Sequence, residues 1–515
     1  MMQARLPSPL SPLAEKRLDV LVIGGGLYGV SIAREALGYG LKVALVEKRG
    51  IGSGASSRAA ERIGWKHFST LWANLSSLRS VAHERLHLVR SHAPAVRLLP
   101  WLRSIKRQAR AKQIQWHAFE RLATLSRTAA SPPWPAPRQV SAEAMQILLP
   151  GVCLQGTGEI PMIHEAVADV RRLSEVVAMA AARRGGDVWT RCEVIAVDAL
   201  SSASGPLLSV QIRDGLTGTI VCIEARSLVL AVGIDTDRVR RTFGWGTEDL
   251  LEGEIVQHET VLRRTIDAGA GIDCDAEILP GRRSALIVDR RDGRTRDVLE
   301  QLFGVAAPSI QSRRVSRFAV MKKRKADKSF GDGSATMEMR HGVLCFTVVG
   351  GSAVFHRSAG RAVARRIAAA LGSKTSASDR PSLLVPGGDM ISAEGETAAA
   401  RARGLSFEQA EWLVRRYGSL WKSVLEMSQE RDIALGASAI PLACEVGWAI
   451  EHERVRSLSD LMASWHAPEL GVDEERLLDD TASAMAHRLS WNDARLEREI
   501  ARWRRERDWY EHEQR

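Results

Sequence analysis

The clearest hydrophobic pattern of the chain lies near its N-terminus. Residues 18–23 (LDVLVI) form a short, valine-rich apolar run, which is typical of a fully buried parallel strand. Three glycines follow at once, and helix-forming residues then run from position 28 to about 37, where Gly38 and Gly40 end them. Residues 41–46 (LKVALV) form a second apolar run. The pattern predicts a strand, a helix and a second strand, the beginning of an α/β fold of Rossmann type.

The turn between the first strand and the helix carries a phosphate-binding pattern. Gly24, Gly26 and Gly29 satisfy G-x-G-x-x-G, in which glycines allow a tight turn, a close approach of a pyrophosphate and close packing of the helix on the strand. Glu47 ends the second strand, where a carboxylate can accept both ribose hydroxyls of an adenosine. Because these elements follow in order, they predict a dinucleotide site at the N-terminus of the helix.

The sequence around this motif also resembles a known family. Residues 22–58 (VIGGGLYGVSIAREALGYGLKVALVEKRGIGSGASSR) look like the N-terminus of the FAD-dependent glycerol-3-phosphate dehydrogenases, members of the D-amino-acid-oxidase-like flavoproteins. The cofactor implied is FAD. The resemblance adds the following residues to the three glycines and Glu47 as expected cofactor contacts: Leu27, Tyr28, Lys48, Ser56, Ser57 and Arg58.

Three later segments support the resemblance in the expected order. Residues 168–198 are similar to the family's helix, Gly-Gly turn and strand, with Val194 near the adenine. Residues 225–239 resemble the strand and turn that close on the FAD from the other side, at Gly233. Residues 344–371 resemble the late strand, double glycine and helix that point at the flavin ring. This last segment implies cofactor contacts from Gly350, Gly351, Ser352 and Ala353.

The resemblance implies an architecture for the whole chain: a Rossmann-like FAD-binding domain, an interleaved antiparallel β-sheet substrate domain and a helical C-terminal domain. Apolar runs at 252–264 and 284–291 read as strands of the sheet domain. Helical spacing at 405–417, with Ser406 as N-cap and Gly418 as stop, continues at 444–465 and 488–503. The expected divisions are a flexible tail at 1–17, an oxidoreductase domain at 18–380 with FAD-binding segments 18–80, 165–240 and 340–372, and the helical domain at 388–515.

The substrate region departs from the family pattern. Where the family reads S-S-R-S-S-K-L-I-H-G-G-L-R-Y, this chain replaces the lysine with Glu61 and the arginine with Phe68. The His-Gly-Gly positions hold Gly64, Trp65 and Lys66. Since arginine is the usual residue for gripping a phosphate, these losses argue against ordinary glycerol 3-phosphate as the substrate.

Four residues are the candidates for catalysis and substrate binding. Arg317 aligns with one family arginine and Arg357 with the helix arginine, while His356 and His67 can accept a proton as hydride leaves, because the pKa of imidazole lies near neutrality. One interpretation is an altered active site that oxidises a small hydroxyl- or amine-bearing molecule. A phosphorylated polyol is the first compound to test, because Arg317 and Arg357 can form part of an anion site. The other is a degenerate flavin-binding homologue that serves as a scaffold or partner-binding module.

Composition and charge narrow the classes of partner, metal site and cellular location that remain. The 515-residue chain has a net charge of +11, but no nucleic-acid motif accompanies that charge, so nucleic acid is not an expected partner. Six scattered cysteines without metal-ligand spacing fit a cytoplasmic location and no metal site. No apolar run is long enough to span a bilayer.

Residues 100–127 read as one or two basic amphipathic helices, which pack on their own domain or contact a membrane surface. Quinone, oxygen or another molecule is the expected electron acceptor, and an oligomer is possible.

Overall fold

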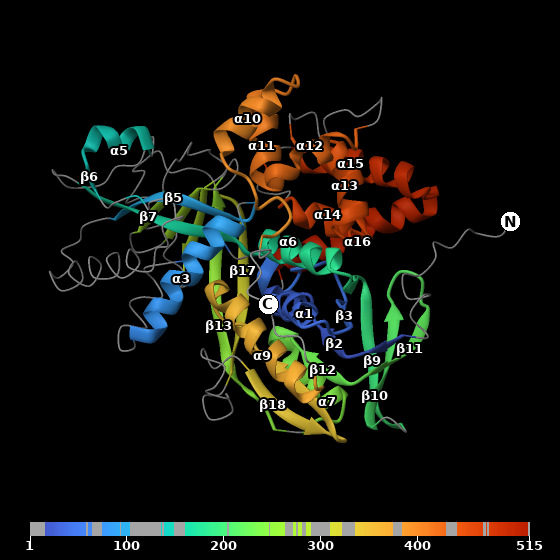
Figure 1. Cartoon of the computed structure of the whole chain (residues 1–515). Coiled ribbons are helices and arrows are strands. Elements are labelled where there is room, and N and C mark those ends of the chain that lie inside the picture. The colour runs from blue at the N-terminus through green and yellow to red at the C-terminus, as the bar shows by residue number, and fades with distance from the viewer. Residues whose placement is uncertain are drawn as a thin grey trace.

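A computed structural model gives the three-dimensional structure of the chain. It describes residues 16–57, 60–63, 75–92, 94–103, 135, 138–148, 160–202, 205–246, 248–262, 271–273, 277–280, 285–289, 310–321, 335–373, 384–428, 440–466, 470 and 473–512. Figure 1 shows the C-terminal helices gathered on one side of the molecule, next to helix α6. Among the described helices, none is long and apolar enough to cross a membrane.

A mainly parallel sheet forms the centre of the described structure. Its strand order is β18-β19-β12-β2-β3-β8, and only β18 runs antiparallel to its neighbour. These strands are β2 (Val20–Ile23), β3 (Val43–Val46), β8 (Asp187–Trp189), β12 (Ser227–Leu230), β18 (Ala335–Arg340) and β19 (Val343–Val348). The predicted strand, helix and strand at the N-terminus are confirmed, and their parallel pairing matches a Rossmann-like domain.

The apolar runs are continuous because both faces of this sheet are covered. Alternate residues of a strand point to opposite faces. Val20 and Val22 belong to one buried cluster, which lies under the helices, whereas Leu21 and Ile23 belong to another, which faces a second sheet. That second sheet has the order β1-β11-β10-β9, with β1 (Arg17–Leu18), β9 (Cys192–Ser202), β10 (Gly205–Asp214) and β11 (Ile220–Ala225).

The first apolar run therefore contributes to two sheets instead of one. β1 pairs with β11 and β2 pairs with β12, and the chain passes from one sheet to the other at Asp19. The Asp19 carboxylate accepts a hydrogen bond from Lys42 N at 2.9 Å and pairs with Arg226 at 3.0 Å. This polar residue marks the division, which hydrophobicity alone does not reveal.

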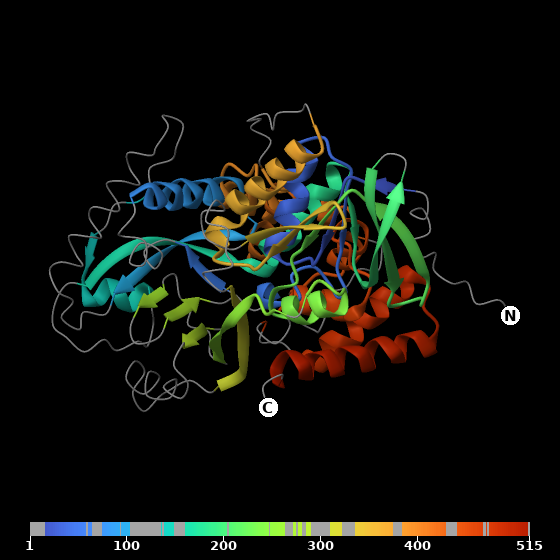
Figure 2. The ribbon, with the colours of Figure 1, turned by 90° about the horizontal axis from the view of Figure 1, so that it is seen from below.

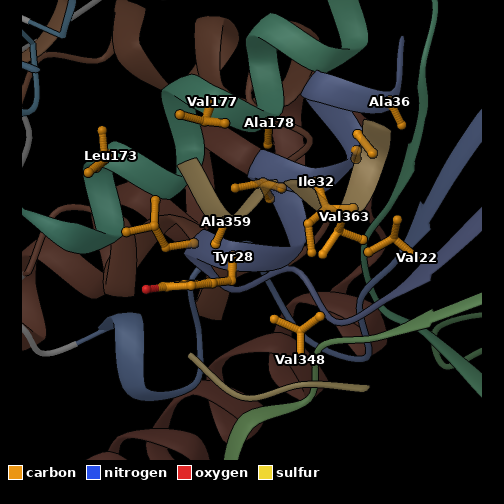
Figure 3. Packing of buried hydrophobic residues seen from close by; sticks show 14 of the residues in the cluster. Val22, Tyr28, Ile32, Ala36, Leu173, Val177, Ala178, Val348, Ala359 and Val363 are labelled. Atoms are coloured by element: carbon orange, nitrogen blue, oxygen red, sulfur yellow. The ribbon is translucent and has the colours of Figure 1, made fainter. Parts of the chain in front are cut away.

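Helix α1 (Leu27–Gly38) lies between helices α6 (Val170–Arg183) and α9 (His356–Ala370). Figure 3 shows aliphatic side chains from all three helices in one cluster, among them Ile32, Val177 and Val363. Figure 2 shows the same region from below, with α3 (Leu75–Ser91) beside α9. A shorter helix, α7 (Thr236–Thr242), follows β12.

The expected sheet is present, mainly antiparallel and larger than the sequence indicated, with one parallel pair between β14 and β5. Its main path is β17-β13-β16-β15-β14-β5-β7-β4, and β6 pairs with β7. The described strands are β4 (Ala60–Ile63), β5 (Val96–Arg103), β6 (Arg138–Val140), β7 (Ile160–Asp169), β13 (Leu251–Leu262), β14 (Gly271–Asp273), β15 (Glu277–Pro280), β16 (Ala285–Asp289) and β17 (Ile310–Met321). The short helix α5 (Ala142–Leu148) follows β6.

One helical expectation is wrong within this sheet. Residues 100–103, which were expected to begin an amphipathic helix, belong to strand β5. β5 pairs with β7 on one side and β14 on the other, so its Trp101 is completely buried. Long-range pairing therefore overrides the local helical spacing. The rest of the basic segment lies outside the described residues.

The helical C-terminal region is confirmed in the fold. Ser406 forms a capping box with Gln409 at the start of one helix, and Gly418 at φ +58° ends that helix. Left-handed residues Arg454 and Ser490 separate helices that the sequence pattern ran together. The helices are α10 (Ala393–Arg401), α11 (Phe407–Tyr417), α12 (Trp421–Leu425), α13 (Cys444–His452), α14 (Leu458–Ser464), α15 (Glu474–Leu489) and α16 (Asp493–His512).

The crossing of α1 and α9 gives a test of this packing. A Cβ atom at Gly360 would lie 3.0 Å from the Ser31 carbonyl carbon, which belongs to the backbone of α1. We predict that Gly360→Val lowers the free energy of unfolding by about 1–3 kcal/mol, because the helices must move apart. Chemical denaturation measures the change. Gly395→Ala, at a helical glycine with room for a methyl group, is the matched control and leaves stability equal or higher. Equal stability of the Gly360 variant and the native chain would contradict the packing described.

Candidate functional site

A cavity of about 460 Å³ opens at the carboxyl ends of the parallel strands. This edge is where ligands bind in open α/β sheets. The cavity is lined by residues from chain segments that are far apart in sequence. Of the expected cofactor contacts, the lining includes Gly24, Gly26, Leu27, Tyr28, Glu47, Lys48, Ser56, Val194, Gly233, Gly350, Gly351 and Ala353.

The glycine turn has the shape that the motif requires. Gly24 has a φ of +107°, and a Cβ atom there would lie 2.3 Å from the Ala231 carbonyl oxygen. A Cβ atom at Gly29 would lie 2.0 Å from the Gly24 oxygen, so Gly29 supports the turn by close packing and is not itself among the lining residues. Gly26 is the N-cap of α1 and supplies no side chain to the first N–H groups. The turn itself therefore carries no side chain at the start of α1, where Leu27 N donates to the Ser56 hydroxyl.

The Glu47 carboxylate is fixed beside this turn by hydrogen bonds from the turn and from its own loop. Its Oε2 accepts from Gly25 N at 2.7 Å, and its Oε1 accepts from Arg49 N at 2.8 Å and from Ser53 Oγ at 3.4 Å. The residue is only 9% exposed, yet it lines the cavity. A carboxylate held in this way is oriented to accept hydroxyl donors.

An ion pair joins two walls of the cavity. Lys48 Nζ lies 2.8 Å from Oδ2 of Asp235, and both residues line the cavity. Burial by itself would raise the pKa of Asp235, but the hydrogen bond and charge of Lys48, with help from Arg238, lower it. Sequence reasoning overlooked Asp235 and Arg238, although both lie within residues 225–239, the segment that resembles the family around Gly233. Their polar character was the available signal.

Two serines behave differently from each other. The Ser56 hydroxyl accepts a hydrogen bond from Leu27 N at 3.2 Å, at the first residue of α1. Ser57 is buried and is not among the lining residues.

Arg58 and His67 lie outside the described residues, as do Gly64, Trp65, Lys66 and Phe68. Arg317 lies on β17 opposite Val256, and its backbone alone is described.

The late glycine turn carries a carboxylate at its end. Glu61 from β4 accepts a hydrogen bond from Ala353 N at 2.8 Å and another from the Ser352 hydroxyl. The Tyr28 hydroxyl donates to the Ser352 carbonyl oxygen at 3.0 Å. The glutamate that stands in place of the family's lysine therefore binds the second backbone N–H after the double glycine, and it lines the same cavity.

Arg357 and His356 lie behind that turn, and neither is among the lining residues. The Arg357 guanidinium forms two hydrogen bonds with Glu84 of α3, at 2.8 and 2.7 Å, and is 4% exposed. His356 is 1% exposed, and its Nδ1 lies 2.6 Å from the Ser31 hydroxyl. Both residues thus have partners in the interior of the described structure.

His356 belongs to a buried group of histidines. Its ring lies 6.0 Å from that of His92, which lies 5.6 Å from that of His87. Burial, with the nearby charges of Arg34 and Arg357, lowers the pKa of His356 to about 3. The same causes lower the pKa of His87 to about 3 and that of His92 well below its ordinary value. All three imidazoles are therefore neutral at physiological pH.

The residues at the cavity fit FAD. Gly24 and Gly29 are closed to side chains by backbone contacts, the N-cap of α1 is a glycine without a capping side chain, and Glu47 holds a carboxylate beside the turn. These are the donors and acceptor that a diphosphate and an adjoining ribose require. Among the described residues, no three histidine, cysteine or acidic side chains are arranged to hold a metal ion.

The histidine group predicts a loss of stability in acid. In the unfolded chain His356 takes up a proton near pH 6.5, whereas in the folded chain it stays neutral to about pH 3. The contribution of neutral His356 to the free energy of unfolding is therefore complete above pH 6.5, and it falls as the pH is lowered below that value. We predict that the free energy of unfolding lost between pH 7 and pH 5 is smaller in His356→Gln than in the native chain, by about 2 kcal/mol. Guanidinium titrations at both pH values measure it. His487→Gln, at an exposed position of α15, is the control. An identical loss in native and His356→Gln chains would contradict the prediction.

Comparisons with known proteins agree with this site. Residues 19–317, more than half of the chain, match the family described as FAD dependent oxidoreductase, and residues 381–496 match the C-terminal domain of alpha-glycerophosphate oxidase. Glycerol-3-phosphate dehydrogenase 2 of Mycobacterium tuberculosis strain H37Rv is 25% identical over 536 residues, covering 95% of this chain and 88% of that protein. The Mycobacterium leprae glycerol-3-phosphate dehydrogenase is 30% identical over 229 residues, covering 44% and 38%.

A solved structure has the same fold. The glycerol-3-phosphate dehydrogenase from Bacillus halodurans, complexed with FAD, superposes with a TM-score of 0.67 at 16% identity, covering 98% of this chain and 97% of that one. The resemblance inferred from the sequence is thereby confirmed in the family, the fold and the cofactor. This chain belongs to the family of FAD dependent oxidoreductases.

Proposed function

We propose that this FAD-dependent oxidoreductase takes a hydride from a small hydroxyl- or amine-bearing substrate and passes the electrons to a quinone, oxygen or another acceptor. The observation that carries the proposal is the cavity in which the glycine turn, Glu47 and the late double glycine meet. Such a cavity suits an extended dinucleotide whose reactive ring lies near the double glycine. FAD, when bound, supplies the hydride acceptor.

The chain's own residues have separate roles in this proposal. The N–H groups at the start of α1 bind the diphosphate, and Glu47 accepts the ribose hydroxyls. The pair of Lys48 and Asp235 fixes the two walls beside the adenosine. His356 is the interior candidate for a proton acceptor. Its pKa of about 3 makes it a weak base at neutral pH, so this role requires both a path from the cavity and a higher pKa when the substrate is bound.

Substrate recognition in this proposal differs from phosphate gripping. The Arg357 fork is engaged by Glu84, and breaking a buried bidentate pair to bind a substrate phosphate leaves the Glu84 carboxylate unpaired. Glu61 adds a carboxylate to the cavity wall. Both observations favour a substrate without a phosphate. A phosphorylated polyol is the comparison compound, because several relatives are named glycerol-3-phosphate dehydrogenase.

The second candidate function is a flavin-binding scaffold without catalysis. The same engaged arginine favours it, because Arg357, which aligns with the family's helix arginine, is buried and bonded to Glu84. In that case the cofactor is held but no donor reduces it.

The expected membrane contact falls on basic residues after position 103, which lie outside the described part of the chain.

A reduction assay separates these candidates. We expect the purified protein to carry FAD with its visible absorbance, and we expect an amine or an unphosphorylated alcohol to bleach that absorbance without oxygen. Glycerol 3-phosphate serves as the phosphorylated donor, and dithionite as the control that reduces any bound flavin. Bleaching by dithionite alone, with no response to any donor, would support the scaffold. Faster bleaching by glycerol 3-phosphate would contradict the substrate proposal.

The cofactor contact itself is tested at Glu47. We predict that Glu47→Ala raises the Kd of FAD at least about tenfold, because hydrogen bonds to a charged group contribute about 1.5–3 kcal/mol each. Quenching of flavin fluorescence on titration measures the Kd. Glu224→Ala, on the exposed side of β11, is the control and leaves it unchanged. Equal affinities of the two variants would contradict the role of Glu47.

A further inference from the structure

The backbone of Glu47 is hydrogen-bonded, through both its N–H and its carbonyl, to the short link formed by residues 189–192. Its N–H donates to the Trp189 carbonyl at 2.8 Å, and its carbonyl accepts from Cys192 N at 2.9 Å. Between those residues, at the junction of β8 and β9, lies Arg191, whose N–H donates to the Arg49 carbonyl at 3.0 Å. The link at 189–192 therefore determines where the loop that begins at Glu47 lies.

Arg191 is itself tied to the C-terminal region. Its Nε and one terminal nitrogen donate to Asp460 Oδ1 at 2.9 and 2.7 Å, and its terminal nitrogens also donate to Glu506 at 2.7 and 3.1 Å. Asp460 belongs to α14 and Glu506 to α16. Arg191 has a φ of +58°, a conformation that non-glycine residues seldom adopt without support from their surroundings.

This cluster of charges is buried. Arg191 is 7% exposed and Asp460 is 4% exposed. Burial by itself would raise the pKa of Asp460, but the charge and hydrogen bonds of Arg191 lower it, so the carboxylate is ionised at neutral pH. Breaking such a pair leaves a charge without its partner in the interior, which is far more costly than breaking a pair at the surface.

Two further contacts join Asp460 and its neighbour to the cofactor side. A Cβ atom at Gly50 would lie 2.6 Å from Asp460 Oδ1, so Asp460 packs directly on the loop that follows Glu47. Arg456, four residues before Asp460, donates to the Thr190 carbonyl at 2.9 Å and to Asp214 at 3.0 Å. The loop and the link are thus both braced by one segment of the C-terminal region.

We propose that the C-terminal helices are part of the cofactor site, and that Asp460 and Glu506, acting through Arg191, hold Glu47 in position for the adenosine half of FAD. The inference rests on the proposed contact between Glu47 and the ribose. The action is indirect, because no described residue beyond Ala353 lines the cavity. Asp460, Glu506 and Arg191 are positioning residues.

A second buried ion pair provides a matched control. Arg172 of α6 lies 2.7 Å from Glu453, which follows α13, and both side chains are almost completely buried. This pair joins the same two parts of the molecule, but no hydrogen bond connects it to the loop that begins at Glu47 among the contacts described. A variant of Glu453 therefore measures what general docking of the two parts contributes.

The experiment compares Asp460→Asn with Glu453→Gln in the full-length chain. Three quantities are measured: the Kd of FAD by fluorescence quenching, the Kd of ADP as a probe of the adenosine half, and the melting temperature without ligand. We expect Asp460→Asn to weaken both FAD and ADP by roughly tenfold or more, because the loss of the ion pair frees the loop. We expect Glu453→Gln to lower the melting temperature while both affinities stay within about twofold of the native values.

Glu506→Gln keeps the test decisive if Asp460→Asn does not fold, because its partly exposed carboxylate is the easier of the two to lose. It is expected to weaken ADP and FAD about threefold or more. Unchanged affinities in the folded variants would overturn the coupling, and so would an equal weakening by Glu453→Gln. If Glu47→Ala also leaves FAD affinity unchanged, the contact proposed for Glu47 fails, and this inference fails with it. If only Glu47→Ala weakens FAD, the contact stands and the coupling alone is overturned.

Discussion

The close contact between the first glycine turn and helix α1 is the constraint on which the site depends. Because Gly29 lies directly on the Gly24 carbonyl, helix α1 begins close to the end of the strand, and its first residues line the cavity. Glu47 is then bonded to Gly25 inside the same turn. A larger residue at either glycine would move the helix away from the strand, and with it the donors that a diphosphate requires.

Buried charge joins the C-terminal helices to the cofactor domain. Arg172 and Glu175 of α6 meet Arg416 and Glu453 from the helical region, and their side chains are almost completely buried. Burial alone would lower the pKa of Arg416, but its acidic neighbours and Tyr417 raise it above its ordinary value. Removing one member leaves another charge uncompensated. Such an interface tolerates little sliding, so it fixes the position of the C-terminal helices against α6.

The chemistry near the late glycine turn differs from that of a phosphate site. Glu61 binds the backbone at the turn, and Glu84 pairs with the Arg357 guanidinium. The cavity combines a glycine turn and the Glu47 carboxylate, which suit a dinucleotide, with a second carboxylate at the late turn.

The sequence by itself determined the local elements and the cofactor. The glycine spacing and the capping residues Ser406 and Gly418 act within a few residues, so their geometry follows from backbone sterics and short hydrogen bonds.

Only the tertiary structure decided which charges meet. It made β5 a strand because β7 and β14 pair with it, and it brought Glu84 to Arg357 and Asp460 to Arg191 across hundreds of residues. The hydrophobic periodicity of the sequence does not predict such pairs, because an ion pair depends on where two side chains lie in space and not on their separation along the chain.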